Sequence, residues 1–292
     1  MLVKGSIVAL ITPFNEDGSV NFDKLGELIE FHIANHTDAI LVLGTTGETP
    51  TLSHEEDDSV VRYSIAKANK RIPIYVGAGS NSTQTQLTYC QKYEKMGADA
   101  LLIITPYYNK GNPEGIYQHF KVVADNVNIP LILYNVPSRT GCSIPLDQLA
   151  RLAKLPNVAA IKEASGDISY LDKASCLLSD DFQMYSGNDD MVVPALSMGA
   201  SGVISVAANI IPQQMHDMVS AYHCGEVEKS RKLQQHYLDL INKLFIETNP
   251  IPVKEAMNML GMKVGQYRLP LCSMSDEHKA ILKQALKVVE SK

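Results

Sequence analysis

The stretches PLILYN (130–135) and NVAAIK (157–162) decide the fold of this chain. Each is a nearly continuous apolar run with branched side chains, and neither alternates apolar with polar residues. Such runs are typical of strands buried on both faces, as in a parallel sheet. The segment between them has the length of a helix. The two stretches therefore predict a strand–helix–strand unit.

The same pattern recurs along most of the chain. Six further apolar runs bring the number of predicted strands to eight, and they lie at 6–12, 39–43, 73–77, 99–105, 182–186 and 201–206. Eight such units in sequence, with short links, favour an α/β fold of the closed (β/α)8 TIM barrel type. A doubly wound open sheet is the alternative that the pattern leaves open.

Helical signals separate the runs. Residues 23–35 place their large apolar side chains on one face of a helix, and Ser53 with Glu56 forms the pattern of a capping box. Ser82 can cap a third helix, which should stop at Gly97.

Strand signals cease at about residue 209, and helices are predicted at 226–246, 251–261 and 275–290. This tail is too long to be only the last barrel helix. We therefore predict a barrel domain over residues 1–224 and a C-terminal α-helical domain over residues 225–292.

Composition excludes several classes of function. The net charge is −6 without a long basic stretch, so nucleic acid is not an expected partner. No apolar stretch reaches 18 residues and the N-terminus lacks a cleavage signal, so neither a membrane nor secretion is expected. The five cysteines show no pairing or zinc pattern, and we expect buried, reduced thiols in a cytoplasmic protein. Phosphate-binding and dinucleotide-binding glycine motifs are missing, so no nucleotide cofactor is expected. His32 and His36 have the spacing of metal ligands on a helix, but no carboxylate motif accompanies them, so they are interpreted as helix-face residues and no metal is expected.

Barrel enzymes carry their catalytic groups at the carboxyl ends of the strands. At the end of the sixth predicted strand lies Lys162, within an apolar run. Burial disfavours an ammonium ion, and a neutral amine is a nucleophile toward carbonyl groups, as Schiff-base lysines are. The alternative is a lysine that extends from the strand end to solvent.

Other strand ends supply groups suited to the same chemistry. Tyr134 ends the neighbouring strand, where a phenol can exchange protons with a carbinolamine. Thr45 and Thr46 precede Gly47 in a tight turn whose hydroxyl and N–H groups could hold a carboxylate. Arg139 follows the fifth strand, and its guanidinium suits a second carboxylate. Each also has a purely structural interpretation. Tyr134 could be a ring packed in the barrel mouth, the threonines could belong to a turn that needs its glycines, and Arg139 could be a surface arginine.

The strand ends resemble those of the dihydrodipicolinate synthase / N-acetylneuraminate lyase family. The resemblance covers essentially the whole chain, in order and spacing, and rests on the motifs GTTGE (44–48), TPYYN (105–109), YNVPSRTG (134–141), IKEA (161–164) and NPIPVK (249–254). It implies the barrel, and a lyase that condenses pyruvate with L-aspartate 4-semialdehyde through a Schiff base on Lys162, in lysine and diaminopimelate biosynthesis.

The resemblance also implies roles for individual residues. Tyr134 would shuttle protons, assisted by Thr45 and by Tyr108 reaching in from a neighbouring subunit of a homotetramer. Thr45 and Thr46 would bind the carboxylate of pyruvate, and backbone at Gly187 and Ile204 would complete the pocket. Arg139 would hold the carboxylate of the semialdehyde. Sugar-acid aldolases of the family generally lack the SRTG loop (138–141), so this loop distinguishes the two branches of the family.

An allosteric lysine site is implied at the positions of His54, Asn81 and Tyr107. Lysine-inhibited members commonly have a second histidine and a glutamate where this chain has Asp57 and Thr85. Losing the glutamate removes a partner for the ammonium group of lysine, although Asp57 could substitute for its charge. We therefore expect weak or absent feedback inhibition.

Two other functions compete with this hypothesis. An aldolase of the same family could act on a sugar-derived aldehyde, which substrate assays would distinguish. A silent pyruvate-binding protein should have lost at least one of the five implied groups. All five are present, at Thr45, Tyr108, Tyr134, Arg139 and Lys162.

Overall fold

Eight parallel strands form a closed barrel in chain order, in a computed structural model that describes residues 2–290. The strands are β1 (Gly5–Ala9), β2 (Ala39–Val42), β3 (Ile74–Gly77), β4 (Ala100–Ile104), β5 (Leu131–Asn135), β6 (Val158–Glu163), β7 (Gln183–Ser186) and β8 (Gly202–Ser205). Each overlaps one of the eight predicted runs. The barrel is confirmed, and the open sheet is excluded.

Helices follow the strands and continue into the tail. They are α1 (Phe22–Ala34), α2 (His54–Ala68), α3 (Thr83–Met96), α4 (Pro113–Ala124), α5 (Pro137–Thr140), α6 (Leu146–Leu152), α7 (Ile168–Ser175), α8 (Val192–Ser197), α9 (Pro212–His223), α10 (Val227–Lys243), α11 (Ile251–Met259), α12 (Asp276–Ala285) and α13 (Lys287–Glu290). Single 3-10 turns are η1 (Thr45–Gly47), η2 (Thr49–Thr51), η3 (Asp189–Met191) and η4 (Ala207–Asn209).

The predicted helix caps are confirmed. Ser53 accepts a hydrogen bond from the backbone N–H of Glu56, whose carboxylate accepts one from the N–H of Ser53, so the capping box is complete. The side chain of Ser82 caps α3, and Gly97 ends that helix with a φ of 94°. A left-handed residue costs little when it is glycine, which is why the helix stops there.

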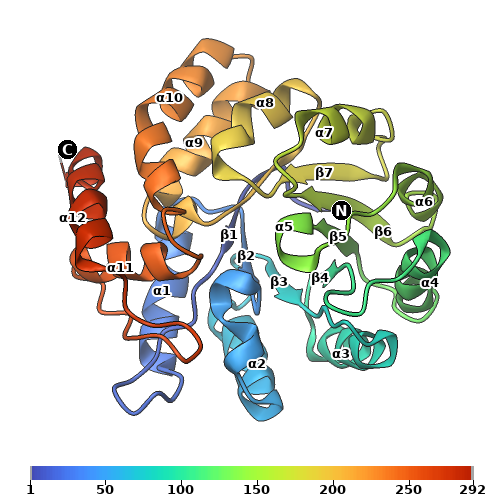
Figure 1. Ribbon diagram of the computed structural model, residues 1–292, viewed down its shortest axis with the longest axis horizontal. Helices are drawn as coiled ribbons and strands as arrows, with labels where there is room; N and C mark the ends of the chain where they lie inside the picture. Colours follow the sequence, from blue (N-terminus) through green and yellow to red (C-terminus); the bar gives the residue numbers. More distant parts are fainter. Residues whose placement is uncertain (1, 291–292) are drawn as a thin grey trace. The chain divides into compact units, whose positions relative to one another are not determined.

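The contacts of the chain divide into two compact units. The first comprises the residues up to Lys4 together with Ile74–Ile204, and it holds β3–β7, α3–α8 and most of β8. Within it, α3, α4, α6 and α7 lie on the outside of β4–β7 (Figure 1). These strands are buried almost throughout, which makes them the core of this unit.

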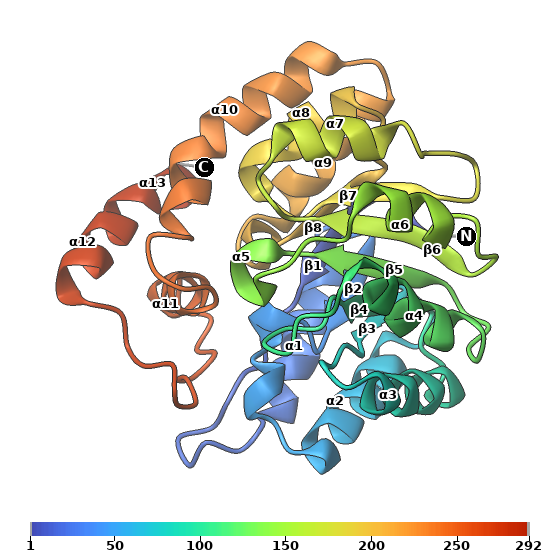
Figure 2. The ribbon, with the colours of Figure 1, turned by 45° about the vertical axis from the view of Figure 1, so that its right-hand side comes forward.

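The second unit comprises Gly5–Pro73 and Ser205–Lys292, and it holds β1, β2, α1, α2 and α9–α13. Helix α9 contacts β1, α10 packs against α9, and α12 contacts both α10 and α11 (Figure 2). The three helices predicted for the tail are present, and the last of them is divided into α12 and α13. The predicted domain boundary after residue 224 falls between α9 and α10 and stays a prediction.

Two features differ from the sequence-based expectations. The segment after β5 is not an open loop but the helical turn α5, which begins at Pro137 and is closed by Gly141 at a φ of 72°. The cysteines were expected to be buried, yet only Cys90 is; Cys142 is half-buried, and the other three, Cys176, Cys224 and Cys272, are exposed at helix ends and in a loop. All five are free thiols. Within residues 2–290, no helix has the length and apolar character needed to cross a membrane.

Candidate active site

Lys162 and Tyr134 lie side by side at the carboxyl ends of β6 and β5. They are register partners in the parallel ladder, which places their side chains on the same face of the sheet. The Lys162 Nζ lies 4.4 Å from the centroid of the Tyr134 ring. The exposed fractions of the two residues are 6% and 8%. The amine therefore does not extend to solvent, and the alternative interpretation of Lys162 is wrong.

Lys162 has no charged partner among the residues whose side chains the structure describes. A buried cation in a protein is normally paired with a carboxylate or fully hydrogen-bonded. Among the side chains of residues 2–289, no carboxylate lies within ion-pair distance of the Lys162 Nζ, and no acceptor takes a hydrogen bond from it. The phenol of Tyr134 likewise has no hydrogen-bond partner among those residues. Both groups are therefore free to contact a ligand.

Gly187 makes room for the lysine. A Cβ atom at this position would lie 3.0 Å from the Lys162 Cε and 2.5 Å from the Cβ of Ala164. The second distance is shorter than real Cβ contacts allow. The backbone N–H of Gly187 donates to the carbonyl of Glu163 at 2.6 Å, and Ile204 on the next strand is 1% exposed. The predicted pocket residues Gly187 and Ile204 therefore lie at the carboxyl ends of β7 and β8.

A buried polar clamp, missed by sequence reasoning, holds β5 against β6. The Asn135 side chain donates to one carboxylate oxygen of Glu163 at 2.7 Å, and the N–H of Ser165 donates to the other at 2.6 Å. Burial raises the pKa of Glu163, while these hydrogen bonds act in the opposite direction. Asn135 and Glu163 directly follow the Tyr134–Lys162 register pair. The clamp therefore keeps the phenol and the amine aligned.

In the second unit, the turn η1 carries the two threonines. The N–H of Gly47 donates to the carbonyl of Gly44 at 3.0 Å, and the Thr12 hydroxyl donates to the carbonyl of Gly47 at 2.7 Å. Thr46 is 2% exposed, and Thr45 is half-buried. Within the part of the chain that the structure describes, no acceptor takes the backbone N–H of Thr45 or Thr46. Successive free N–H groups beside hydroxyls suit an anion such as a carboxylate.

The structure does not bring every predicted residue to the buried lysine. Arg139 lies on α5 with its side chain exposed. Tyr108 is 93% exposed at a φ of 69°, so in the single chain it stands away from the buried amine. Of the predicted lysine site, Asn81 donates to the carbonyl of Tyr107 at 3.2 Å, and His54 is the first residue of α2.

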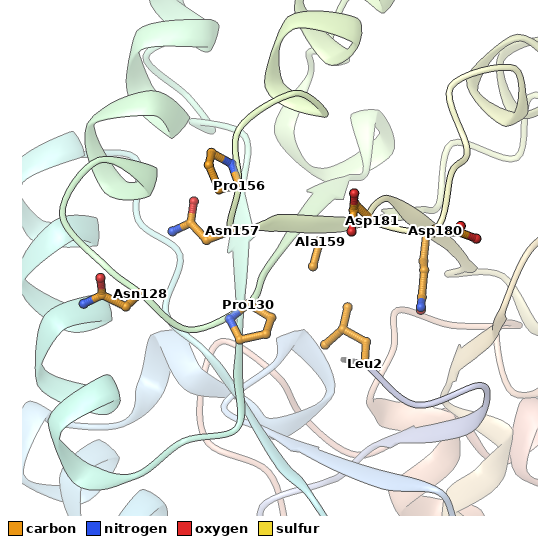
Figure 3. Close-up of a pocket in the computed structure, with 9 residues that line it drawn as sticks. Leu2, Asn128, Pro130, Pro156, Asn157, Ala159, Asp180 and Asp181 are labelled. Atoms are coloured by element: carbon orange, nitrogen blue, oxygen red, sulfur yellow. The ribbon is translucent and has the colours of Figure 1, made fainter.

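A cavity of about 320 Å³ lies elsewhere in the first unit (Figure 3). It is lined by Pro130 and Asn157, which immediately precede β5 and β6, and by Asp181, which lies shortly before β7. It therefore lies at the amino ends of these strands, whereas Lys162 lies near the carboxyl end of β6. Because barrel enzymes react at the carboxyl ends, this cavity is not the candidate active site.

A buried lysine with no charged partner among the described side chains, beside a phenol at the carboxyl ends of barrel strands, is an arrangement that fits one class of enzyme. These are the lyases of the aldolase type that react through a lysine Schiff base. The chain belongs to the Dihydrodipicolinate synthetase family, whose model matches residues 2–289.

Individual relatives agree with this assignment. The 4-hydroxy-tetrahydrodipicolinate synthase of Clostridium perfringens (strain SM101 / Type A) is 54% identical over 286 residues, which are 98% of each chain. The chloride-inhibited dihydrodipicolinate synthase of Acinetobacter baumannii, solved with pyruvate, has a TM-score of 0.96 at 42% identity and 99% coverage of both chains. The lysine-bound enzyme of Cyanidioschyzon merolae has a TM-score of 0.95 at 36% identity and 98% coverage of both chains.

Proposed function

We propose that this protein condenses pyruvate with L-aspartate 4-semialdehyde to give 4-hydroxy-tetrahydrodipicolinate, a step of lysine and diaminopimelate biosynthesis. The observation that carries the proposal is the buried Lys162 amine, which lies 4.4 Å from the ring centroid of Tyr134 and has no carboxylate partner among the side chains of residues 2–289. The choice of reaction is supported by relatives named 4-hydroxy-tetrahydrodipicolinate synthase, such as the one whose sequence is 54% identical to this chain.

The chemistry begins at the Lys162 Nζ. The amine attacks the keto carbon of pyruvate, and loss of water from the carbinolamine leaves an imine. Loss of a methyl proton gives an enamine, whose carbon attacks the aldehyde of the second substrate and forms the new C–C bond. The amino group of that substrate then attacks the imine carbon, closes the ring and releases Lys162. Tyr134 is the proton shuttle in these steps, assisted by Thr45.

The carboxylates of the two substrates are assigned to different groups. Thr45 and Thr46 hold that of pyruvate through hydroxyl and N–H groups, and backbone at Gly187 and Ile204 completes the pocket. Arg139 holds that of the semialdehyde, which a guanidinium can bind in a bidentate manner.

The assembly completes the site. Tyr108 reaches from a neighbouring subunit, and its 93% exposure in the single chain supports this role. We propose a homotetramer, built as a dimer of dimers, that works in the cytoplasm without a cofactor or a metal.

A substrate comparison tests the proposed reaction. The purified protein is supplied with pyruvate and L-aspartate 4-semialdehyde, and separately with N-acetylneuraminate or 2-keto-3-deoxygluconate for cleavage. We expect condensation to exceed both cleavages by orders of magnitude. Faster cleavage of either sugar acid would assign the chain to the alternative aldolase.

Replacement of Arg139 should affect the second substrate selectively. We expect Arg139→Ala to raise the KM for L-aspartate 4-semialdehyde by about 10- to 100-fold, because a charge-assisted hydrogen bond to a carboxylate contributes roughly 1.5–3 kcal/mol. Arg139→Lys keeps the charge but not the bidentate geometry, so its effect should be intermediate. Adduct formation with pyruvate should stay at the wild-type level in both. An equal loss for both substrates would contradict the assignment.

Feedback by lysine should be weak. Asn81 and Tyr107 are present and in contact, but Thr85 offers no carboxylate for the ammonium group of the effector. We expect little inhibition when L-lysine is titrated into the condensation assay at millimolar concentration. Strong inhibition below a millimolar would contradict this expectation and would point to Asp57 as the substitute charge.

A further inference from the structure

The helical tail contacts the threonine turn through a buried hydrogen bond. The side-chain amide of Asn249, two residues before α11, donates to the Oγ1 of Thr46 at 3.0 Å. The exposed fractions of the two residues are 7% and 2%, and 203 positions separate them in sequence. Asn249 therefore acts on a hydroxyl that sequence reasoning assigned to substrate binding.

A second buried link holds the same turn in place. Glu48, the residue after η1, has a φ of 54°, and its carboxylate accepts hydrogen bonds from the Lys254 Nζ at 2.7 Å and from the N–H of Arg268 at 3.1 Å. The tail thus fixes the backbone of the turn at Glu48. The Asn249 amide, by contrast, makes its hydrogen bond with the Thr46 hydroxyl itself.

The donors and acceptors of the two side chains decide the direction of the hydrogen bond between Asn249 and Thr46. A hydroxyl has one proton to donate and lone pairs to accept with, whereas a side-chain NH2 group only donates. The Thr46 oxygen must therefore be the acceptor in this pair. Within the described chain, no group accepts the Thr46 proton. That proton remains available to a ligand, together with the N–H groups of Thr45 and Thr46.

We propose that Asn249 is a positioning residue that orients the Thr46 hydroxyl as a hydrogen-bond donor to the carboxylate of the keto-acid substrate. The inference rests on the proposed function and adds to it a residue of the tail that does not touch substrate. An interaction made with the ground state and the transition state alike changes KM and leaves kcat nearly constant. The effect should therefore fall on the KM for pyruvate.

Two replacements of Asn249 test the direction of the hydrogen bond. Asn249→Asp supplies an acceptor that takes the Thr46 proton and adds a like charge behind the carboxylate. We expect it to raise the KM for pyruvate by about 30-fold or more. Asn249→Ala only removes the donor, so a rise of about 3- to 10-fold is expected. In both, kcat should change by less than about threefold. Asn249→Ala adds no charge and no bulk, so it remains a test if the aspartate variant does not fold.

Asn258→Ala is the matched control. Asn258 also belongs to the tail, and its side chain donates to the carbonyl of Gly265 at 2.9 Å without touching the threonine turn. We expect this variant to lower the unfolding temperature while leaving the KM for pyruvate at the wild-type value. A rise as large as that of Asn249→Ala would overturn the proposal, because loosening of the tail would then explain both.

A double-variant cycle separates positioning from an independent effect. In a Thr46→Val background the hydroxyl is gone, so Asn249→Ala should raise the KM for pyruvate no further. Independent, multiplicative effects of the two changes would overturn the proposal. So would an unchanged KM in both Asn249 variants. Borohydride trapping of pyruvate by the wild-type protein is run beside these assays: its failure rejects the proposed function, whereas success with an unchanged KM rejects only the role of Asn249.

Discussion

Borohydride added together with pyruvate is expected to leave a covalent adduct on the peptide that contains Lys162, and Lys162→Ala is expected to leave none. The hydride reduces the imine to a stable secondary amine, so peptide mass mapping identifies the residue that reacted. Condensation should fall by about 10⁴-fold or more in the variant, because loss of a covalent nucleophile removes the reaction path itself. No other change to a single side chain should affect activity as much.

Lys110→Ala is the control for this experiment. Lys110 is an exposed lysine whose Cε lies 2.7 Å from the position that a Cβ on Gly141 would occupy, so it is close to the α5 turn that carries Arg139. An exposed lysine is strongly hydrated, which disfavours attack on a carbonyl carbon. The control should therefore form the adduct at the wild-type level. An adduct that maps to Lys110, or that persists in Lys162→Ala, would remove the basis of the proposed function.

Replacement of the second buried lysine should reduce stability. The Lys254 Nζ donates to Glu48, to the carbonyl of Thr12 at 3.2 Å and to the carbonyl of Gln266 at 2.5 Å, and the side chains of Lys254 and Glu48 are fully buried. Burial lowers the pKa of Lys254, and the charge of Glu48 opposes that shift. Lys254→Met would leave the Glu48 carboxylate buried without its cation. We expect a loss of about 3–5 kcal/mol in the free energy of unfolding.

Denaturant unfolding measures this loss, with Lys279→Met as the control. The Lys279 Nζ lies 3.8 Å from the carboxylate of Glu255, and the two side chains are 31% and 18% exposed. A pair of this kind contributes about 1 kcal/mol or less. Adding Glu48→Gln to Lys254→Met removes the unpaired charge, so the double variant should recover part of the lost stability. Equal losses for Lys254→Met and Lys279→Met would show that the buried ion pair contributes no more to the free energy of unfolding than the partly exposed pair does.

The two buried lysines differ in the groups that surround their side-chain nitrogens. Lys254 has a carboxylate and two carbonyls around its ammonium group, which satisfies all three of its N–H donors. Lys162 has the Tyr134 ring beside its Nζ, and its Cε lies 3.0 Å from the position that a Cβ on Gly187 would occupy. The first arrangement stabilises a cation. The second leaves the Lys162 amine without such partners among the described residues, as the proposed attack on a keto acid requires.

Much of the fold was predictable because its signals are local. Eight buried runs, a complete capping box at Ser53 and a glycine stop at Gly97 each depend on residues close in sequence. A last barrel helix was predicted within the tail, but the predicted helix ranges do not include α9 at Pro212–His223. The turn α5 was predicted as a loop. In α5 a single turn between Pro137 and Gly141 is too short to show a helical period.

The sequence by itself determined where the eight strands lie, and with that the placement of Lys162 and Tyr134 at the carboxyl ends of their strands, whereas the closed order of the barrel came from the structure. This was possible because a strand-end position depends only on where an apolar run stops. Only the tertiary structure decided which polar groups meet: Asn135 with Glu163, Asn249 with Thr46 and Lys254 with Glu48. These pairs are separated by 28, 203 and 206 positions. A hydrogen bond between residues so far apart produces no periodic pattern in the sequence. It forms only after the chain has folded and water has been excluded.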